Sequence, residues 1–291
     1  MSETLLDGHI HKISLTDTRS EFRQRMACAK ARGGTVISLP PPAYRSAAGQ
    51  SEIPAETRLD DVLAWCAGEP ELFPFFWIDP LEEGADEQVA LATERGIRGF
   101  KIICDRFHPG DKRVLDIVAL VARARQPILF HAGILWDGKP SSRFNRPAEF
   151  EPLLEVDGLR FALAHMAWPW CDELIAVYGK FLNARASGNE RGVEMFVDTT
   201  PGTPPVYRRE ALTKLFGVGY DIRHNVVFGS DSDTGAYNAE WVRQWTERDT
   251  AILSEAGLND EDLRLYFSGN LLRFLDSSAA RPAASLPRVA T

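Results

Sequence analysis

The sequence alternates short apolar segments with longer amphipathic segments from one end to the other. The short segments are rich in Val, Ile and Phe and are apolar on both faces, as is typical of buried parallel strands. Strands are predicted at residues 4–10, 34–39, 72–78, 97–103, 127–132, 160–166, 194–199 and 225–230. Parallel strands need crossover connections, usually helices. This alternation therefore constrains the fold more than any other feature.

The segments between the strands have the periodicity of helices. Helices are predicted at residues 20–32, 59–66, 87–94, 114–125, 171–186, 209–216 and 241–256. Repeated strand–helix units in a chain of 291 residues favour an α/β protein with a closed (β/α)8 barrel, the TIM barrel. A split into two domains is the alternative, but no segment has the composition of a linker. We expect one barrel domain over residues 1–276 and a disordered tail over residues 277–291.

Histidines gather where the predicted strands end. The chain has six histidines, and four of them, His9, His11, His131 and His165, end predicted strands, as does Asp231. His9 and His11 lie two positions apart, so their side chains should point to the same side of a strand. In a closed barrel these strand ends meet at one mouth, where active sites of this fold lie. A single histidine at a strand end is more often a packed residue, but the joint pattern favours a metal site.

This donor set has a definite chemistry. Neutral imidazoles together with a carboxylate suit Zn²⁺ or a similar divalent ion, such as Mn²⁺. Such an ion polarises a carbonyl oxygen and lowers the pKa of bound water towards about 7, and a nearby His or Asp can then move the proton. The sequence therefore predicts a metal-dependent enzyme.

Other polar and aromatic residues fall in the loops of the same face. Trp136 and Arg143 follow the fifth strand, Trp168 follows the sixth, and Asp198 ends the seventh. Aromatic walls with a cation suit a planar or cyclic substrate that carries a carboxylate. The alternative is that the tryptophans pack the loops, the cation is solvated and Asp198 caps its loop. Lys101, at the end of the fourth strand, is expected to pair with a charge or to contact substrate.

Several classes of function have no support in the sequence. The net charge of −8 argues against a nucleic-acid surface, and no apolar run approaches the roughly 20 residues of a membrane helix. Four widely spaced cysteines and an N-terminus without signal-peptide features favour a cytoplasmic protein. Phosphate-loop, dinucleotide and serine-elbow motifs are absent. A small-molecule substrate is therefore expected, and self-association is left open.

The motifs at the strand ends resemble those of the amidohydrolase superfamily. The resemblance rests on Asp7-Gly8-His9-Ile10-His11, Phe130-His131-Ala132-Gly133, Leu163-Ala164-His165, Val227-Phe228-Gly229-Ser230-Asp231 and the closing segment Phe267–Leu275. It covers residues 4–275 and is strongest for the amidohydrolase-related branch, which includes aminocarboxymuconate-semialdehyde decarboxylase, aromatic-acid decarboxylases and small lactonases. Two tryptophans, Trp168 and Trp170, stand where smaller residues are more usual in that branch.

The resemblance implies roles for these residues. His9, His11, His131 and Asp231 would hold one metal ion, and His165 would orient or deprotonate its water. Asp231 would share in proton transfer. In some relatives a carboxylated lysine at the position of Lys101 bridges two ions. We expect one ion here.

Three functions are compatible with this pattern. The main hypothesis is a hydrolase that cleaves a C–O or C–N bond of a small cyclic or carboxylated substrate. The second keeps the site but makes the reaction a non-oxidative decarboxylation of an aromatic or enoic acid, a lyase reaction. The third is a catalytically silent barrel that only binds a ligand or a metal ion, and the intact set of metal-binding residues argues against it.

Overall fold

Parallel strands form the centre of the protein. The computed structural model describes residues 5–45, 53–276 and 278. Within these residues one sheet has the order β8-β7-β6-β5-β4-β3-β2-β1-β9. Its strands are β1 (Leu5–His11), β2 (Ala31–Ile37), β3 (Leu72–Trp77), β4 (Gly99–Ile102), β5 (Ile128–Phe130), β6 (Arg160–Leu163), β7 (Glu194–Asp198), β8 (Val226–Val227) and β9 (Ser232–Asp233). Each neighbouring pair is parallel, as the continuous apolar segments predict.

The barrel closes through a strand that is interrupted in its middle. β8 pairs with β7, whereas β9, a few residues later, pairs with β1. Between them Gly8 N donates to Phe228 O at 2.9 Å, and Asp231 N donates to His9 O at 3.0 Å. The sequence predicted one strand over 225–230. The structure keeps only Val226–Val227 of it as strand, and β9 lies beyond its predicted end. Asp231, between the two strands, has a left-handed backbone (φ 59°) that interrupts the extended conformation.

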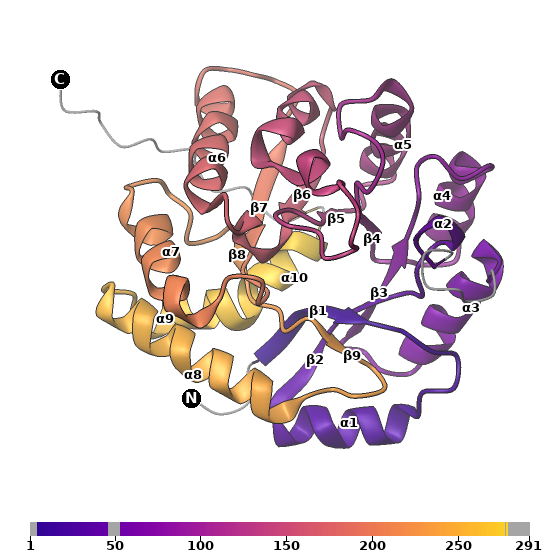
Figure 1. The fold of residues 1–291 in the computed structure, drawn as a ribbon, viewed down its shortest axis with the longest axis horizontal. Coiled ribbons are helices and arrows are strands. Elements are labelled where there is room, and N and C mark those ends of the chain that lie inside the picture. Colours follow the sequence, from indigo (N-terminus) through magenta and orange to yellow (C-terminus); the bar gives the residue numbers. More distant parts are fainter. Residues whose placement is uncertain (1–4, 46–52, 277, 279–291) are drawn as a thin grey trace.

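Helices surround the sheet (Figure 1). They are α1 (Arg19–Cys28), α2 (Pro42–Arg45), α3 (Ala55–Cys66), α4 (Ala85–Glu94), α5 (Lys112–Arg123), α6 (Cys171–Ala186), α7 (Pro205–Gly217), α8 (Ala239–Glu255), α9 (Asp260–Arg264) and α10 (Asn270–Leu275). Short 3₁₀ helices lie at Ser142–Asn145, Pro147–Glu155 and Ala164–Ala167. Each predicted helix overlaps an observed one. None of the helices in the described residues combines the length and apolarity needed to cross a membrane.

Two apolar clusters hold the barrel together. The larger lies between the strands and the outer helices. The smaller fills the barrel interior with side chains such as Leu6, Phe75 and Phe196, and α10 contributes Leu271 and Phe274 to it. The ring centroids of Phe196 and Phe274 are 4.9 Å apart. α10 therefore packs into the barrel interior, and the carboxyl ends of the strands carry the polar residues.

The predicted fold class, a (β/α)8 barrel, is confirmed. The sixth strand is shorter than predicted: it ends at Leu163, and His165 lies in the following 3₁₀ helix rather than in the strand. The predicted tail over 277–291 lies, apart from residue 278, outside the described residues.

Candidate metal centre

The His-x-His pair lies at the carboxyl end of β1. His9 is fully buried, whereas the side chain of His11 is 19% exposed. The two imidazoles point to the same side of the strand, as the two-residue spacing predicts, and their Nε2 atoms are 3.0 Å apart. Two lone pairs at this distance repel one another unless a proton or a cation lies between them.

Asp198 fixes the orientation of His9. Oδ2 of Asp198, at the end of β7, lies 2.9 Å from Nδ1 of His9. Because a carboxylate only accepts, Nδ1 carries the hydrogen and Nε2 keeps its lone pair. Burial acts to raise the pKa of Asp198, but the charge and hydrogen bond of His9 hold this pKa below its ordinary value. A carboxylate behind a histidine is the usual arrangement around a metal-binding imidazole.

Asp231 brings a carboxylate to the same point from the break between β8 and β9. Its Oδ1 lies 3.5 Å from Nε2 of His11 and 3.7 Å from Nε2 of His9. Burial acts to raise the pKa of Asp231, but His11, His165 and His9 hold it well below its ordinary value. The side chain is 40% exposed, so it also faces the open side of the site.

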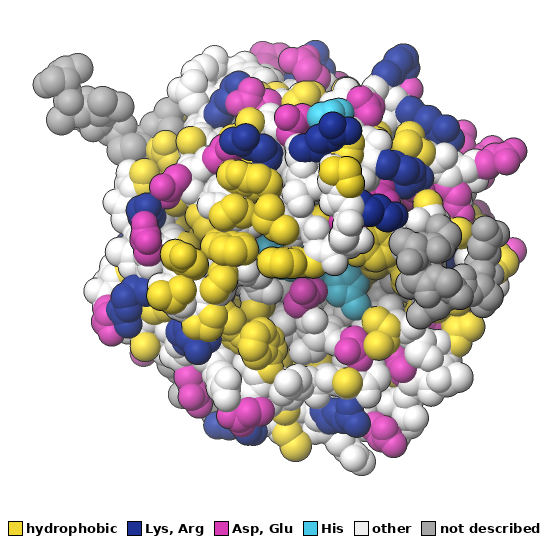
Figure 2. Space-filling model, in the orientation of Figure 1, with side chains coloured by type: hydrophobic (Ala, Val, Ile, Leu, Met, Phe, Trp, Pro, Cys, Tyr) yellow, Lys and Arg dark blue, Asp and Glu magenta, His cyan; other side chains and the backbone are white. Residues whose placement is uncertain are grey.

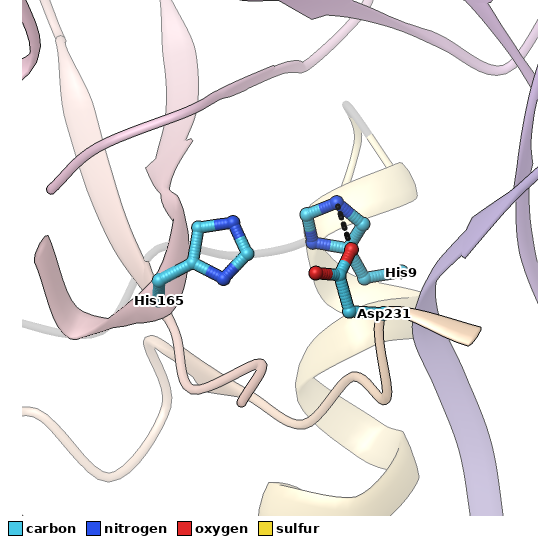
Figure 3. Close-up of side chains that lie close together, drawn as sticks. All are labelled: His9, His165 and Asp231. Carbon is cyan, nitrogen blue, oxygen red and sulfur yellow. Dashed lines mark ion pairs between the residues drawn. The ribbon is translucent and has the colours of Figure 1, made fainter. Parts of the chain in front are cut away.

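His165 enters from the opposite wall. Figure 3 shows its ring facing His9 and Asp231 across a common space. One ligand atom from each of these three residues can be chosen so that all lie within 4.8 Å of one another. Burial lowers the pKa of His165 to about 4, and its buried Nδ1 has no hydrogen-bond partner among the described residues.

The backbone around His165 is strained. His165, Met166 and Ala167 have φ values of 59°, 49° and 51°, so three consecutive non-glycine residues are left-handed. Each costs about 1–2 kcal/mol relative to the right-handed conformation, and strain of this kind gathers at functional sites. Gly202, after β7, leaves room for the ring, since a Cβ there would lie 2.7 Å from Cβ of His165.

His131 follows β5 directly and lies beside His165, with ring centroids 4.9 Å apart. Its Nε2 lies 3.3 Å from the carbonyl oxygen of Ile134. That oxygen only accepts, so Nε2 carries the hydrogen and Nδ1 keeps its lone pair. Burial, and then His165 and Lys101, lower the pKa of His131 well below its ordinary value.

Lys101 lies among these histidines at the end of β4. Its Nζ is 3.3 Å from Nε2 of His9, and the side chain is buried. Burial lowers the pKa of Lys101 to about 8, although Asp198 and Asp231 act in the opposite direction. The pKa of His9 is lowered by burial and by Lys101.

The donors at this point suit a divalent ion. Two ligand atoms held by one tetrahedral ion, each about 2.1 Å from it, are about 3.4 Å apart. The distances among His9 Nε2, His11 Nε2 and Asp231 Oδ1 are 3.0, 3.5 and 3.7 Å. The unpartnered Nδ1 of His165 shows in addition that the polar groups do not satisfy one another. The residues therefore fit a metal ion.

A cavity of about 460 Å³ opens onto these side chains. Trp136, Trp168 and Lys101, which the sequence singled out, lie in its wall, together with His9, His11, His131, His165 and Asp231. Figure 2 shows hydrophobic side chains around a hollow that holds histidine and acidic groups. Trp136 is 81% exposed. The backbone next to it is held in place, because Leu135 N donates to Ser142 Oγ at 3.1 Å.

The structure does not bring every predicted substrate contact to this wall. The guanidinium of Arg143 lies 4.6 Å from the ring centroid of Phe144, and Arg143 is not one of the residues that line the cavity. Asp198 is buried behind His9, where it orients that ring instead of facing the cavity.

Several cavity residues were not singled out as substrate contacts from the sequence, among them Trp77, Asp233 and Tyr44. Trp77 ends β3, and its ring lies between those of His11 and Tyr44, with centroids 5.5 and 4.8 Å away and tilted ring planes. Asp233 lies two residues beyond Asp231 and also lines the cavity. Their positions at the carboxyl ends of strands were the available signal. Tyr44 gave no such signal, because it lies in the short helix α2 after the second strand.

Comparison with known proteins places these residues in a family. The amidohydrolase family model matches residues 7–276. No curated protein matches the sequence.

Solved structures share the fold at low sequence identity. 2,6-Dihydroxybenzoate decarboxylase from Rhizobium has a TM-score of 0.61 and 14% identity, with 94% of this chain and 98% of that chain covered. 5-Carboxyvanillate decarboxylase from Novosphingobium aromaticivorans, complexed with manganese and a nitrobenzoic acid, has a TM-score of 0.59 and 12% identity, covering 90% and 80%. An amidohydrolase from Burkholderia multivorans with bound HEPES has a TM-score of 0.58 and 13% identity, covering 93% and 98%.

Proposed function

The chain belongs to the amidohydrolase family, and on this premise we propose that it is a metal-dependent hydrolase of a C–O or C–N bond in a small cyclic or carboxylated molecule. The observation that carries the proposal is the convergence of His9, His165 and Asp231, with ligand atoms within 4.8 Å of one another. They lie in the wall of a cavity whose volume suits a small molecule.

Four residues would hold the ion. His9, His11 and Asp231 offer donor atoms at mutual distances close to those of metal ligands. His131 would supply the fourth through Nδ1, since its Nε2 faces a carbonyl oxygen. Three imidazoles and one carboxylate favour Zn²⁺, with Mn²⁺ as the alternative. When bound, the ion supplies a Lewis acid at the inner end of the cavity.

Proton transfer falls to His165 and Asp231. Both face the space into which the substrate must enter, and Figure 3 shows them on opposite sides of it. The imidazole of His165 is held neutral by burial, so it can accept a proton from water and return it to the leaving group. Lys101 lies beside His9 and would favour a negatively charged group of the substrate.

The test is hydrolysis of lactones and cyclic amides by protein loaded with Zn²⁺ or Mn²⁺. We expect lactone opening to release a proton and so to consume base at pH 8, and cyclic-amide opening to release a primary amine that fluorescamine detects. His9→Ala should lose both activities together with the metal. A loaded protein that holds the ion but opens none of these rings would argue against hydrolysis.

Decarboxylation is the second candidate, because two proteins of similar fold are named as aromatic-acid decarboxylases. The aromatic cavity residues, among them Trp77 and Trp168, would accommodate an aromatic ring. Release of CO₂ from a panel of hydroxybenzoates, measured beside the lactone assay, separates the two reactions.

A further inference from the structure

Asp233 presents a second carboxylate to the cavity. Outside the metal centre, the described residues of the cavity wall are mostly aromatic or aliphatic, and Asp233 is the carboxylate among them. It lies on β9 in register with His11. Because it is two residues beyond Asp231, its Cα is at most about 7 Å from that of Asp231. Asp233 is therefore near enough to the metal centre for one small ligand to contact both.

Only one of the two carboxylate oxygens of Asp233 accepts a hydrogen bond within the described residues. Ala236 N donates to Oδ1 at 2.6 Å, and within the described part of the chain no hydrogen bond reaches Oδ2. Burying or covering an ionised carboxylate is costly unless its lone pairs receive donors. A ligand that fills the cavity must therefore offer a donor to this oxygen or lose affinity.

No cation of the described residues pairs with Asp233. Among the described residues, none of the ion pairs within 4.0 Å includes Asp233. Lys12 lines the cavity, but its Nζ is turned towards Asp61 at 3.5 Å and lies 3.8 Å from the ring centroid of Trp65. Arg25 reaches the same loop but donates to the carbonyl of Gly235 at 2.7 Å.

The surroundings add negative charge. A Cβ built on Gly235 would lie 2.8 Å from Oδ1 of Asp17 and 3.4 Å from Oδ1 of Asp233, so both carboxylates approach this glycine. A ligand carboxylate would be repelled here, whereas at the inner end of the cavity it would meet Lys101 and the metal ligands.

We propose that Asp233 recognises a hydrogen-bond donor, a hydroxyl or an ammonium group, at the end of the substrate remote from the metal centre. The inference rests on the proposed function and narrows its substrate class. The substrate is a small ring with an acyl or carboxylate group at the inner end and a donor at the outer end. Asp233 binds the substrate and takes no part in bond cleavage.

Equilibrium binding of non-reacting ligands tests whether Asp233 recognises a hydrogen-bond donor. The Zn²⁺-loaded full chain is titrated with 3- and 4-hydroxybenzoate, 4-(aminomethyl)benzoate, 4-methoxybenzoate and terephthalate, following tryptophan fluorescence and heat. We expect at least one donor-bearing ligand to bind roughly 10- to 100-fold more tightly than the methoxy analogue, since hydrogen bonds to charged groups contribute this much. The hydroxyl and aminomethyl ligands distinguish a neutral from a cationic donor, and terephthalate should bind most weakly.

Variants distinguish a direct contact between Asp233 and the ligand from a general effect of negative charge near the cavity. Asp233→Ala should bring the donor-to-methoxy ratio close to one, and Asp233→Asn, which keeps the size of the side chain, should lower it. Asp17→Asn removes a neighbouring charge and should leave the ratio within about threefold of wild type. Equal binding of donor and methoxy ligands by wild type, no binding of any ligand, or an equal loss in Asp17→Asn would overturn the inference. Failure of the proposed function would instead appear as absent metal or absent turnover, which these ratios do not measure.

Discussion

Oδ2 of Asp198 lies 2.9 Å from Nδ1 of His9, and this bond joins the ends of β7 and β1 beneath the candidate metal centre. Both side chains are buried. The pair holds the His9 ring so that Nε2 faces His11 and Asp231. Asp198 therefore supports the site without lining the cavity.

Asp198→Asn should weaken metal binding by about 10- to 100-fold, the usual effect of losing the partner behind a metal-binding histidine. An amide can donate to Nδ1 and so favour the wrong tautomer of His9. Competition with a fluorescent chelator measures the affinity, and the exposed Asp157→Asn is the control. Unchanged affinity would show that the ring is held by other contacts.

His131→Ala and His165→Ala should have different consequences. His131→Ala should lose metal, because we assign it as a ligand, whereas His165→Ala should keep the metal and lose about 10²–10⁴-fold in turnover. Metal content and kcat are measured on the same samples. A metal-free His165→Ala protein would make His165 a ligand, an outcome that its position within 4.8 Å of His9 and Asp231 makes important to test.

The protein should hold one metal ion per chain, and Lys101→Ala should also hold one. The amine of Lys101 lies 3.3 Å from Nε2 of His9, so it could serve as a bridge between two ions only in a carboxylated form. Elemental analysis of protein purified without chelator gives the count. Two ions per chain, falling to one or none in Lys101→Ala, would contradict this prediction.

Ala167→Gly should leave the free energy of unfolding unchanged or raise it by up to about 1 kcal/mol. Glycine relieves the left-handed strain at φ 51°, which offsets its greater freedom in the unfolded chain. Ala119→Gly, in the interior of α5, should instead cost about 1 kcal/mol. Urea unfolding measures both variants, and equal losses in the free energy of unfolding would mean that the backbone at Ala167 is not strained.

Asp249→Ala should destabilise the protein by about 3–5 kcal/mol. Arg208 donates to Asp249 through Nε at 2.9 Å and Nη2 at 2.5 Å, and Tyr266 donates at 2.7 Å, all in the interior. Removal of Asp249 would leave the buried guanidinium unpaired. Asp172→Ala, which breaks an exposed pair with Lys214, should cost less than about 1 kcal/mol. Urea unfolding measures both variants, and similar losses in the free energy of unfolding would contradict the prediction that the buried pair matters more.

The sequence by itself determined the barrel and the approximate positions of its polar residues. Apolar segments separated by amphipathic ones can be buried only as alternating strands and helices, and a two-residue spacing places His9 and His11 on one face. Histidine and aspartate at the ends of parallel strands must then meet at one mouth.

Only the tertiary structure decided what each side chain contacts. From the sequence, Asp198, Arg143 and Trp136 were all expected to contact substrate. In the structure Asp198 lies behind His9, and Arg143 lies against the ring of Phe144. The break at Asp231 and the left-handed turn at His165 were not predicted, because they depend on contacts between segments distant in the chain. Strand periodicity is a local property, whereas the direction of a loop side chain is set by the neighbours that fold against it.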